Sequence, residues 1–264
     1  MPNGNIHKKG FSPEPPDGRD LSKERILLHC CCAPCSTAII EWMVGEGLRP
    51  GIFFSNSNIV PFREYAIRRD ELVRYAAAHG LETIDDEYDH TAWLAFVRRL
   101  ESPLTCEGAF LSAEQTAPSA ESAGAPRLLR VADMPERGPR CLECFKFRLL
   151  RAARYAATHG CTLLTTTLAS SRWKDVGQVD AAGRWACEKV NASQVVLGND
   201  LLPMSCPDAV SDNVQASAVR RQTRVLWWNQ NWRRGGLQER RNALIKEWDM
   251  YNQTFCGCEF SERH

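Results

Sequence analysis

The chain has 264 residues, of which 44% are hydrophobic and 25% charged, and its formal net charge is +1. This composition is typical of a globular protein with one large domain, or a domain with an appendage. The balanced charge excludes a uniformly basic or acidic protein, so any basic surface must be local.

No apolar run approaches the roughly 18 residues that a membrane-spanning helix requires. The first 24 residues are polar, with several Pro and Gly, and lack the apolar core of a signal peptide. We therefore expect a cytoplasmic protein with no membrane association. In a reducing compartment, its 12 cysteines are expected to be metal ligands or redox groups rather than disulfides.

Residues 1–24 are expected to form a disordered or loosely ordered tail. After it, residues 26–28 and 52–54 are short apolar runs typical of buried strands, and a helical pattern lies between them. Two strands joined by a helix form a βαβ unit, which implies a parallel sheet with helices on its faces. The fold class expected is therefore α/β, with a parallel-sheet core and flanking helices.

The same alternation continues along the chain. Further helices are predicted at residues 61–79, 93–100, 144–160 and 175–190. Further strands are predicted at residues 163–168, 195–197 and 225–228. We expect residues 25–264 to form a single α/β metalloenzyme domain with insertions at about 106–133 and 198–224.

Three groups of cysteines carry the chemistry of this sequence. Cys30, Cys31, Cys32 and Cys35 follow the first predicted strand and open its helix. The other two groups are Cys141 with Cys144, which open a predicted helix, and Cys256 with Cys258 near the end of the chain. Ligand sites form beyond the carboxyl ends of parallel strands, and a helix N-terminus favours the thiolate that binds metal. We expect a metal site at that edge of the sheet.

Together these groups offer seven or eight thiols, more than the four of a tetrahedral zinc site. That surplus favours an iron–sulfur cluster with thiols left for a second metal or for redox chemistry. The alternative for a lone Cys-x-x-Cys is a structural zinc clip or a buried thiol pair. Four isolated cysteines are expected to be small buried hydrophobic residues: Cys106, Cys161, Cys187 and Cys206.

The cysteine groups lie within a series of motifs that resembles the QueH-type epoxyqueuosine reductases. The motifs keep the family's order and span nearly the whole chain from Arg25 onward. They are LLHCCCAPC at 27–35, NIVP at 58–61 with EY at 64–65, RCxxC at 140–144 with RL at 148–149, TTTLxS at 165–170 with Lys174, RRGG at 233–236, and FCGCEFS at 255–261.

The resemblance implies an α/β oxidoreductase that removes the epoxide oxygen of epoxyqueuosine at the wobble position of tRNA, the last step in making queuosine. It implies a [4Fe-4S] cluster and an adjacent iron ion without cobalamin. A HUP or ATP-pyrophosphatase-like topology and an external electron donor such as ferredoxin or flavodoxin are also expected.

The motifs also imply a set of metal ligands, whose division between the cluster and the second metal stays open. Cys30 is a weaker candidate because many relatives are expected to lack a cysteine there. Asp89 is a candidate oxygen ligand. The remaining ligands are Cys31, Cys32, Cys35, Cys141, Cys144, Cys256 and Cys258.

Removing an epoxide oxygen requires two electrons, protons and polarisation of the C–O bond. His29, Glu64 and Tyr65 are candidate proton donors, although a histidine that ends a buried strand is more often a hydrogen-bonding residue. The substrate-binding candidates are Asn58, Lys174, Arg233 and Arg234.

A contact with tRNA is predicted from local charge. Between residues 219 and 246 there are eight basic residues and a single acidic one, interleaved with Trp227, Trp228 and Trp232. Such a strip suits phosphate contacts and stacking on an unstacked base. Without the family motifs, the same pattern favours tryptophans in the core and arginines on a solvated face.

Two other functions compete with the reductase. One is a tRNA sulfur-transfer enzyme of ATP-pyrophosphatase-like fold, although a cysteine-rich turn stands where that chemistry needs a Gly-rich phosphate loop. The other is a zinc-stabilised RNA-binding module with no catalytic activity.

Overall fold

A computed structural model describes residues 13–101, 130–197 and 223–261 of the chain. The predicted insertions lie largely outside these residues, as do Cys106, Cys206 and the first half of the predicted tail. Within the described residues, no helix is long and apolar enough to cross a membrane.

The core is a parallel sheet of five strands in the order β3-β2-β1-β4-β5, which confirms the predicted α/β class. The strands are β1 (Ile26–Cys30), β2 (Gly51–Phe54), β3 (Thr83–Asp85), β4 (Leu163–Thr166) and β5 (Leu226–Trp227). The helices are α1 (Ala33–Gly45), α2 (Phe62–Ala78), α3 (His90–Arg98), α4 (Pro139–Thr158), α5 (Val176–Leu197) and α6 (Leu237–Glu247).

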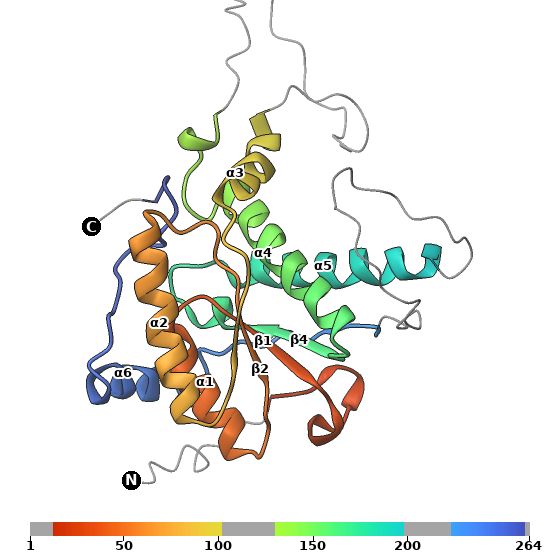
Figure 1. The fold of residues 1–264 in the computed structure, drawn as a ribbon, viewed down its shortest axis with the longest axis vertical. Coiled ribbons are helices and arrows are strands. Elements are labelled where there is room, and N and C mark those ends of the chain that lie inside the picture. The colour runs from red at the N-terminus through yellow and green to blue at the C-terminus, as the bar shows by residue number, and fades with distance from the viewer. Residues whose placement is uncertain (1–12, 102–129, 198–222, 262–264) are drawn as a thin grey trace, which may run out of the picture.

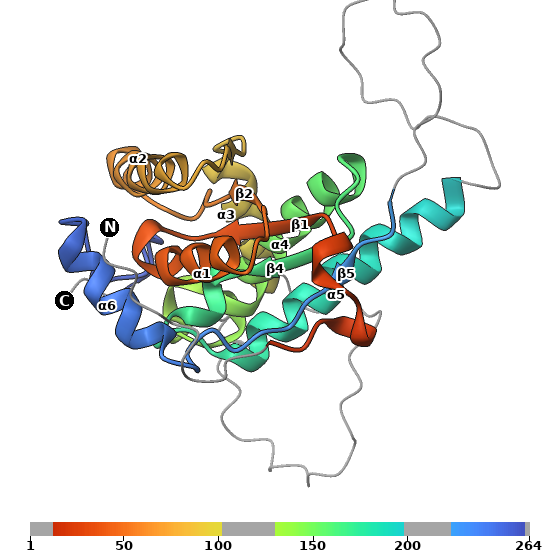
Figure 2. The same cartoon turned by 90° about the horizontal axis from the view of Figure 1, so that it is seen from below.

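Helices cover both faces of this sheet. Figure 1 shows α1, α2 and α6 on one side and α4 and α5 on the other, and Figure 2 gives the same layers from below. Helix α1 packs against α2 and α6, and α4 packs against α5. Because both faces are covered, the central strands consist mostly of apolar residues, and all five residues of β1 are buried.

Short 3-10 helices connect several of these elements. They are η2 (Pro16–Gly18), η3 (Leu21–Lys23), η4 (Arg99–Glu101), η5 (Val131–Asp133) and η6 (Thr167–Ser170). Residues 13–24, which belong to the predicted tail, are therefore ordered around η2 and η3. The indole Nε1 of Trp228 donates to the carbonyl oxygen of Glu14 at 3.0 Å, so this segment is tied to the end of β5.

One prediction of secondary structure was wrong, and one strand was missed. Residues 195–197 were expected to form a strand but are the last turn of α5. The edge strand β3 was not predicted, because Thr83–Asp85 is only three residues long and none of its side chains is fully buried. The helices predicted at 61–79, 93–100, 144–160 and 175–190 are confirmed as α2, α3, α4 and α5.

Candidate metal centre

The site lies where β1 and β4 end side by side. From β1, the chain adds β2 and β3 on one side of the sheet and β4 and β5 on the other. The gap between β1 and β4 is therefore the point where the strand order reverses, and α/β proteins bind ligands at such points. The backbone N–H of Cys31 donates to Thr167 Oγ1 at 3.2 Å, so the turn after β1 is bonded directly to the turn after β4.

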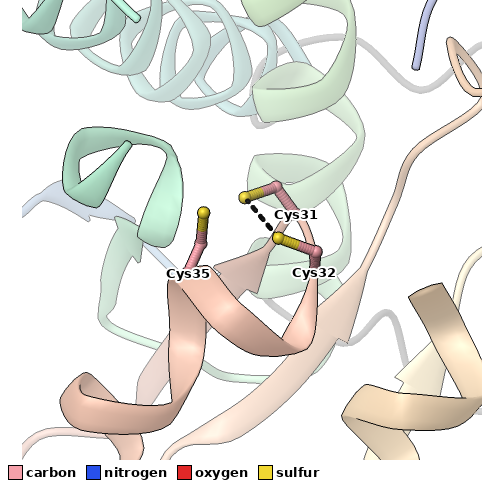
Figure 3. Close-up of side chains that lie close together, drawn as sticks. All are labelled: Cys31, Cys32 and Cys35. Carbon is pink, nitrogen blue, oxygen red and sulfur yellow. Dashed lines mark hydrogen bonds between the residues drawn. The ribbon is translucent and has the colours of Figure 1, made fainter. Parts of the chain in front are cut away.

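The first cysteine group lies in the turn from β1 into α1. Cys32 is the extended residue that precedes the helix, and Pro34 occupies the first turn, where its missing N–H costs nothing. Cys35 is in the same turn, so its side chain comes back toward the strand end. The sulfur atoms of Cys31, Cys32 and Cys35 all lie within 4.8 Å of one another and converge on one point (Figure 3).

The second and third groups come from α4 and from the C-terminal segment. Cys141 and Cys144 are three residues apart near the start of α4, so they share one face of the helix. Cys256 and Cys258 flank Gly257, whose φ of 100° lies in the region that favours glycine. The thiols of these four cysteines interact electrostatically with one another.

Three contacts hold the C-terminal segment over the sheet. Arg68 Nη1 donates to the carbonyl oxygen of Cys256 at 2.8 Å, and the N–H of Val60 donates to that of Gly257 at 2.9 Å. Gln253 Nε2 lies 2.7 Å from Cys32 Sγ and joins the segment to the first cysteine group. The first and third cysteine groups are therefore parts of one site.

A single cavity of about 140 Å³ unites the groups. Cations lie at its wall: Arg148 is only 2% exposed, and Lys174 is partly buried. All seven cysteines predicted as metal ligands line it: Cys31, Cys32, Cys35, Cys141, Cys144, Cys256 and Cys258.

The electrostatics favour thiolates at two positions. Hydrogen bonds from Cys32 and Cys35 hold the pKa of Cys31 well below its usual value. A hydrogen bond from Cys258 does the same for the pKa of Cys256. Burial opposes both shifts, and the charges of Lys174 and Arg148 support them.

The charge of Lys174 is influenced by thiols of the first and third groups at once. Burial lowers its pKa, but the charges of Cys31, Cys256 and Cys35 outweigh burial and leave the pKa raised. Its ammonium group is therefore charged and faces thiolates from two different parts of the chain. Soft thiolate ligands held among buried cations fit a thiolate-ligated metal cluster, whose negative charge such cations balance.

The structure brings two of the four predicted substrate residues to the cavity. Asn58 and Lys174 line it, and the amide oxygen of Asn58 is buried without a hydrogen-bond partner among the described residues. Arg233 does not line it but donates to the carbonyl oxygens of Ser171 and Lys174. Arg234 lies at a separate hollow beside residues 13–17.

The three predicted proton donors are not among the described residues that line the cavity. His29 is fully buried, with Nδ1 2.7 Å from Thr166 Oγ1 and Nε2 3.1 Å from the carbonyl oxygen of Ser55. Burial, supported by the Arg148 charge, lowers its pKa to about 3, so it stays neutral. Through its two hydrogen bonds, the imidazole ring links β1 to β4 and to the residue that follows β2.

Glu64 and Tyr65, at the start of α2, are likewise engaged in hydrogen bonds within the protein. Glu64 accepts from Arg68 Nε at 2.7 Å and from the hydroxyl of Tyr251. The Tyr65 hydroxyl donates to Asp85 at 2.6 Å, and burial raises its pKa. Both side chains connect α2 to other segments, so the geometry gives no support to direct proton donation by them.

Asp89 also stands apart from the cysteines. Its carboxylate accepts from the N–H of Ala92 at 2.8 Å and so caps the start of α3, and it does not line the cavity. Cys30 is buried in the core with its sulfur 3.5 Å from the carbonyl oxygen of Leu28. Cys161 and Cys187 are core residues, as expected of isolated cysteines.

The predicted strip of tryptophans is not a stacking surface. Trp228 and Trp232 are at most 1% exposed and belong to the core. The indole of Trp227 is partly buried and donates to Asp180 at 2.7 Å. Among the arginines of that strip, Arg240 pairs with Glu41. The alternative of a tryptophan core is therefore confirmed for Trp228 and Trp232.

Several residues of the site were not predicted from the sequence, among them Arg148, Arg68 and Gln253. Arg148 lies seven residues after Cys141 on α4, so helical spacing alone places it on the same face as the cysteines. Arg68 and Gln253 carry no comparable signal, because only the packing of the C-terminal segment brings them to the cavity.

A parallel α/β sheet that gathers seven thiols and buried cations at its carboxyl edge defines a protein of the metal-binding or redox class. Comparison with known families gives the particular one. A family model described as epoxyqueuosine reductase QueH matches residues 26–128, 125–197 and 207–264. The chain belongs to the QueH family of epoxyqueuosine reductases, which are oxidoreductases of queuosine biosynthesis.

Individual relatives cover most of the chain. The epoxyqueuosine reductase QueH of Haemophilus influenzae is 31% identical over 95% of this chain and 75% of its own length. The protein of the same name from Histophilus somni is 31% identical over 90% of this chain and 72% of its own length. The epoxyqueuosine reductase QueH of Acinetobacter baylyi is 29% identical over 94% of this chain and 83% of its own length.

Proposed function

We propose that this chain reduces the epoxide of epoxyqueuosine to queuosine at the wobble position of tRNA, and that the reaction takes place at the seven-cysteine cavity. The observation that carries this proposal is the convergence of three distant cysteine groups on one cavity in a member of the QueH family. Family membership favours this activity over the sulfur-transfer and zinc-module alternatives.

Seven thiols are enough to hold a [4Fe-4S] cluster and a single additional iron ion together. Four cysteines suffice for one cluster, and three remain for the ion. When bound, such groups would supply electrons one at a time and a Lewis acid for the epoxide oxygen.

The chain's own residues would prepare the substrate. Removal of an epoxide oxygen breaks two C–O bonds, consumes two electrons and two protons, and releases water as an alkene forms. Lys174 places a positive charge at the cavity wall, where it would stabilise negative charge that develops on the oxygen. The unpartnered amide oxygen of Asn58 would accept a hydrogen bond from the modified base.

Arg233 would act on the substrate through Lys174. Its guanidinium group donates to the carbonyl oxygen of Lys174 at 2.7 Å and would fix the backbone from which the lysine side chain extends. Arg234, which lies at a separate hollow, would contribute only to contacts with the body of the tRNA.

The rest of the proposal concerns partners and topology. The strand order supports the HUP or ATP-pyrophosphatase-like topology that the family resemblance implies. The two electrons require an external donor such as a ferredoxin or flavodoxin. The proposal includes a cytoplasmic location, where tRNA and such donors are found.

Anaerobic reconstitution tests the proposal. The protein is loaded with iron and sulfide and quantified, and then incubated with a strong reductant and tRNA from a queuosine-deficient host that accumulates epoxyqueuosine. Nucleoside analysis should show conversion to queuosine. Cys187→Ala, a core change away from the cavity, serves as the control and should convert at the wild-type rate. Iron-loaded protein that leaves epoxyqueuosine unchanged would overturn the proposal.

A further inference from the structure

Trp173 is an exposed aromatic residue at the mouth of the cavity. Its side chain is 52% exposed, whereas most large hydrophobic residues that the structure describes are buried. It lines the cysteine cavity and also an adjoining hollow of about 460 Å³. The next residue, Lys174, faces the thiolates. One short turn therefore presents a cation to the reaction site and an indole to its entrance.

This turn is held in place along its backbone. Arg137 donates to the carbonyl oxygens of Arg172 and Trp173 at 3.1 and 3.0 Å. Arg233 donates to those of Ser171 and Lys174. Because four successive carbonyls are engaged by two arginines from distant segments, the turn is preorganised, and a ligand would bind it at little cost in backbone entropy.

The adjoining hollow is positively charged. Three arginines line it together with several side-chain amides, and none of the described residues that line it carries a carboxylate. The guanidinium of Arg172 lies 4.6 Å from the Trp173 ring centroid. Arg241 donates hydrogen bonds to the amide oxygens of Asn242 and Asn252, and within the described part of the chain neither Arg172 nor Arg241 forms an ion pair. Unpaired guanidinium groups beside an exposed indole suit a phosphate and a base.

We infer that Trp173 is a stacking platform for the nucleotide adjacent to the modified base, and that Arg172 and Arg241 bind the phosphates of that single-stranded segment. This inference rests on the proposed function, because it takes the cavity as the place where the wobble base enters. Single-stranded RNA is bound by aromatic side chains in this way, since every base offers a face to stack. The geometry thus places recognition of the anticodon beside the reaction site.

The test uses the reconstituted holoenzyme and an anticodon stem-loop RNA with 2-aminopurine next to the wobble position. Binding of the wild-type protein should quench the probe as it stacks. Trp173→Ala should abolish the quenching and weaken binding about 10-fold, the effect of one lost base–aromatic stack. Trp173→Phe should restore most of both. Arg172→Gln and Arg241→Gln should each reduce the salt dependence of binding by about one phosphate contact.

Phe62→Ala is the matched control, because Phe62 is 55% exposed but lines neither the cavity nor the hollow. It should bind RNA as the wild type does. Suppose that Trp173→Ala binds the RNA and quenches the 2-aminopurine probe as the wild type does, while the wild type still reduces epoxyqueuosine. The stacking role is then overturned and the proposed function stands. If Trp173→Ala instead slows only reduction by a protein electron donor, the hollow serves that donor and the inference is also overturned. Failure of the wild type to reduce epoxyqueuosine would overturn the proposed function itself.

Discussion

Arg68 of α2 donates from Nη1 to the carbonyl oxygen of Cys256, with a distance of 2.8 Å between the two atoms. The same guanidinium forms an ion pair with Glu64 at 2.6 Å, and the arginine is only 4% exposed. A buried charge pair on α2 therefore positions one of the two thiols with strongly lowered pKa values.

Arg68→Ala is expected to lower both stability and metal loading. The variant leaves the Glu64 carboxylate buried without its cation, which costs about 3–5 kcal/mol, and it releases the carbonyl of Cys256. Thermal unfolding and anaerobic iron quantification measure the two effects. Arg69→Ala is the control, because Arg69 pairs with exposed carboxylates and does not contact the C-terminal segment. Wild-type iron content in Arg68→Ala would contradict this role.

Gly257→Ala is expected to disturb the site through one close contact and through its backbone conformation. A β-carbon there would lie 3.0 Å from the Arg68 guanidinium, and the φ of 100° is unfavourable for alanine by about 1–2 kcal/mol. Gly47→Ala has a similar φ of 77° and open space around it, so it isolates the backbone cost. We expect both variants to lose some stability but only Gly257→Ala to lose iron. Equal iron content in the two would show that Gly257 acts through folding alone.

Two adjacent cysteines should behave differently when replaced. Cys31 lines the cavity, whereas Cys30 points into the core. Cys31→Ala should therefore abolish activity and reduce the iron content. Cys30→Ala should keep both and lose about 1 kcal/mol of stability for the atom removed. Anaerobic iron and sulfide analysis with the nucleoside assay distinguishes them, and inactivity of a fully loaded Cys30→Ala protein would place that thiol in the reaction after all.

His29 should make the fold sensitive to acid. Its pKa is about 3 in the folded protein, below the usual 6.5, so the unfolded chain binds the proton more readily between these values. The stability associated with neutral His29 is complete above about pH 6.5 and falls as the pH decreases toward 3. Urea unfolding at pH 7 and pH 5 should therefore show a larger loss in the wild type than in His29→Gln. The same loss in both would assign the acid sensitivity to other groups.

Much of the fold could be predicted because parallel strands covered on both faces are apolar throughout. Residues 26–28 and 52–54 are such runs, and they form β1 and β2. Thr83–Asp85 could not be recognised in this way, since an edge strand of three residues depends on its neighbour for its hydrogen bonds. Residues 195–197 have high strand propensity, but propensity is a weak prior, and they continue the helix α5.

The sequence by itself determined which residues can hold a metal. Cysteine is the residue that supplies thiolate ligands, and the spacing along the chain already shows the groups that contain Cys31, Cys141 and Cys256. Only the tertiary structure decided that these groups share one cavity. It also placed Trp232 in the core and Trp173 at the cavity mouth, although each of these tryptophans is followed by a basic residue. The physical reason is that a side chain's surroundings depend on how distant segments pack, and local sequence does not specify that packing.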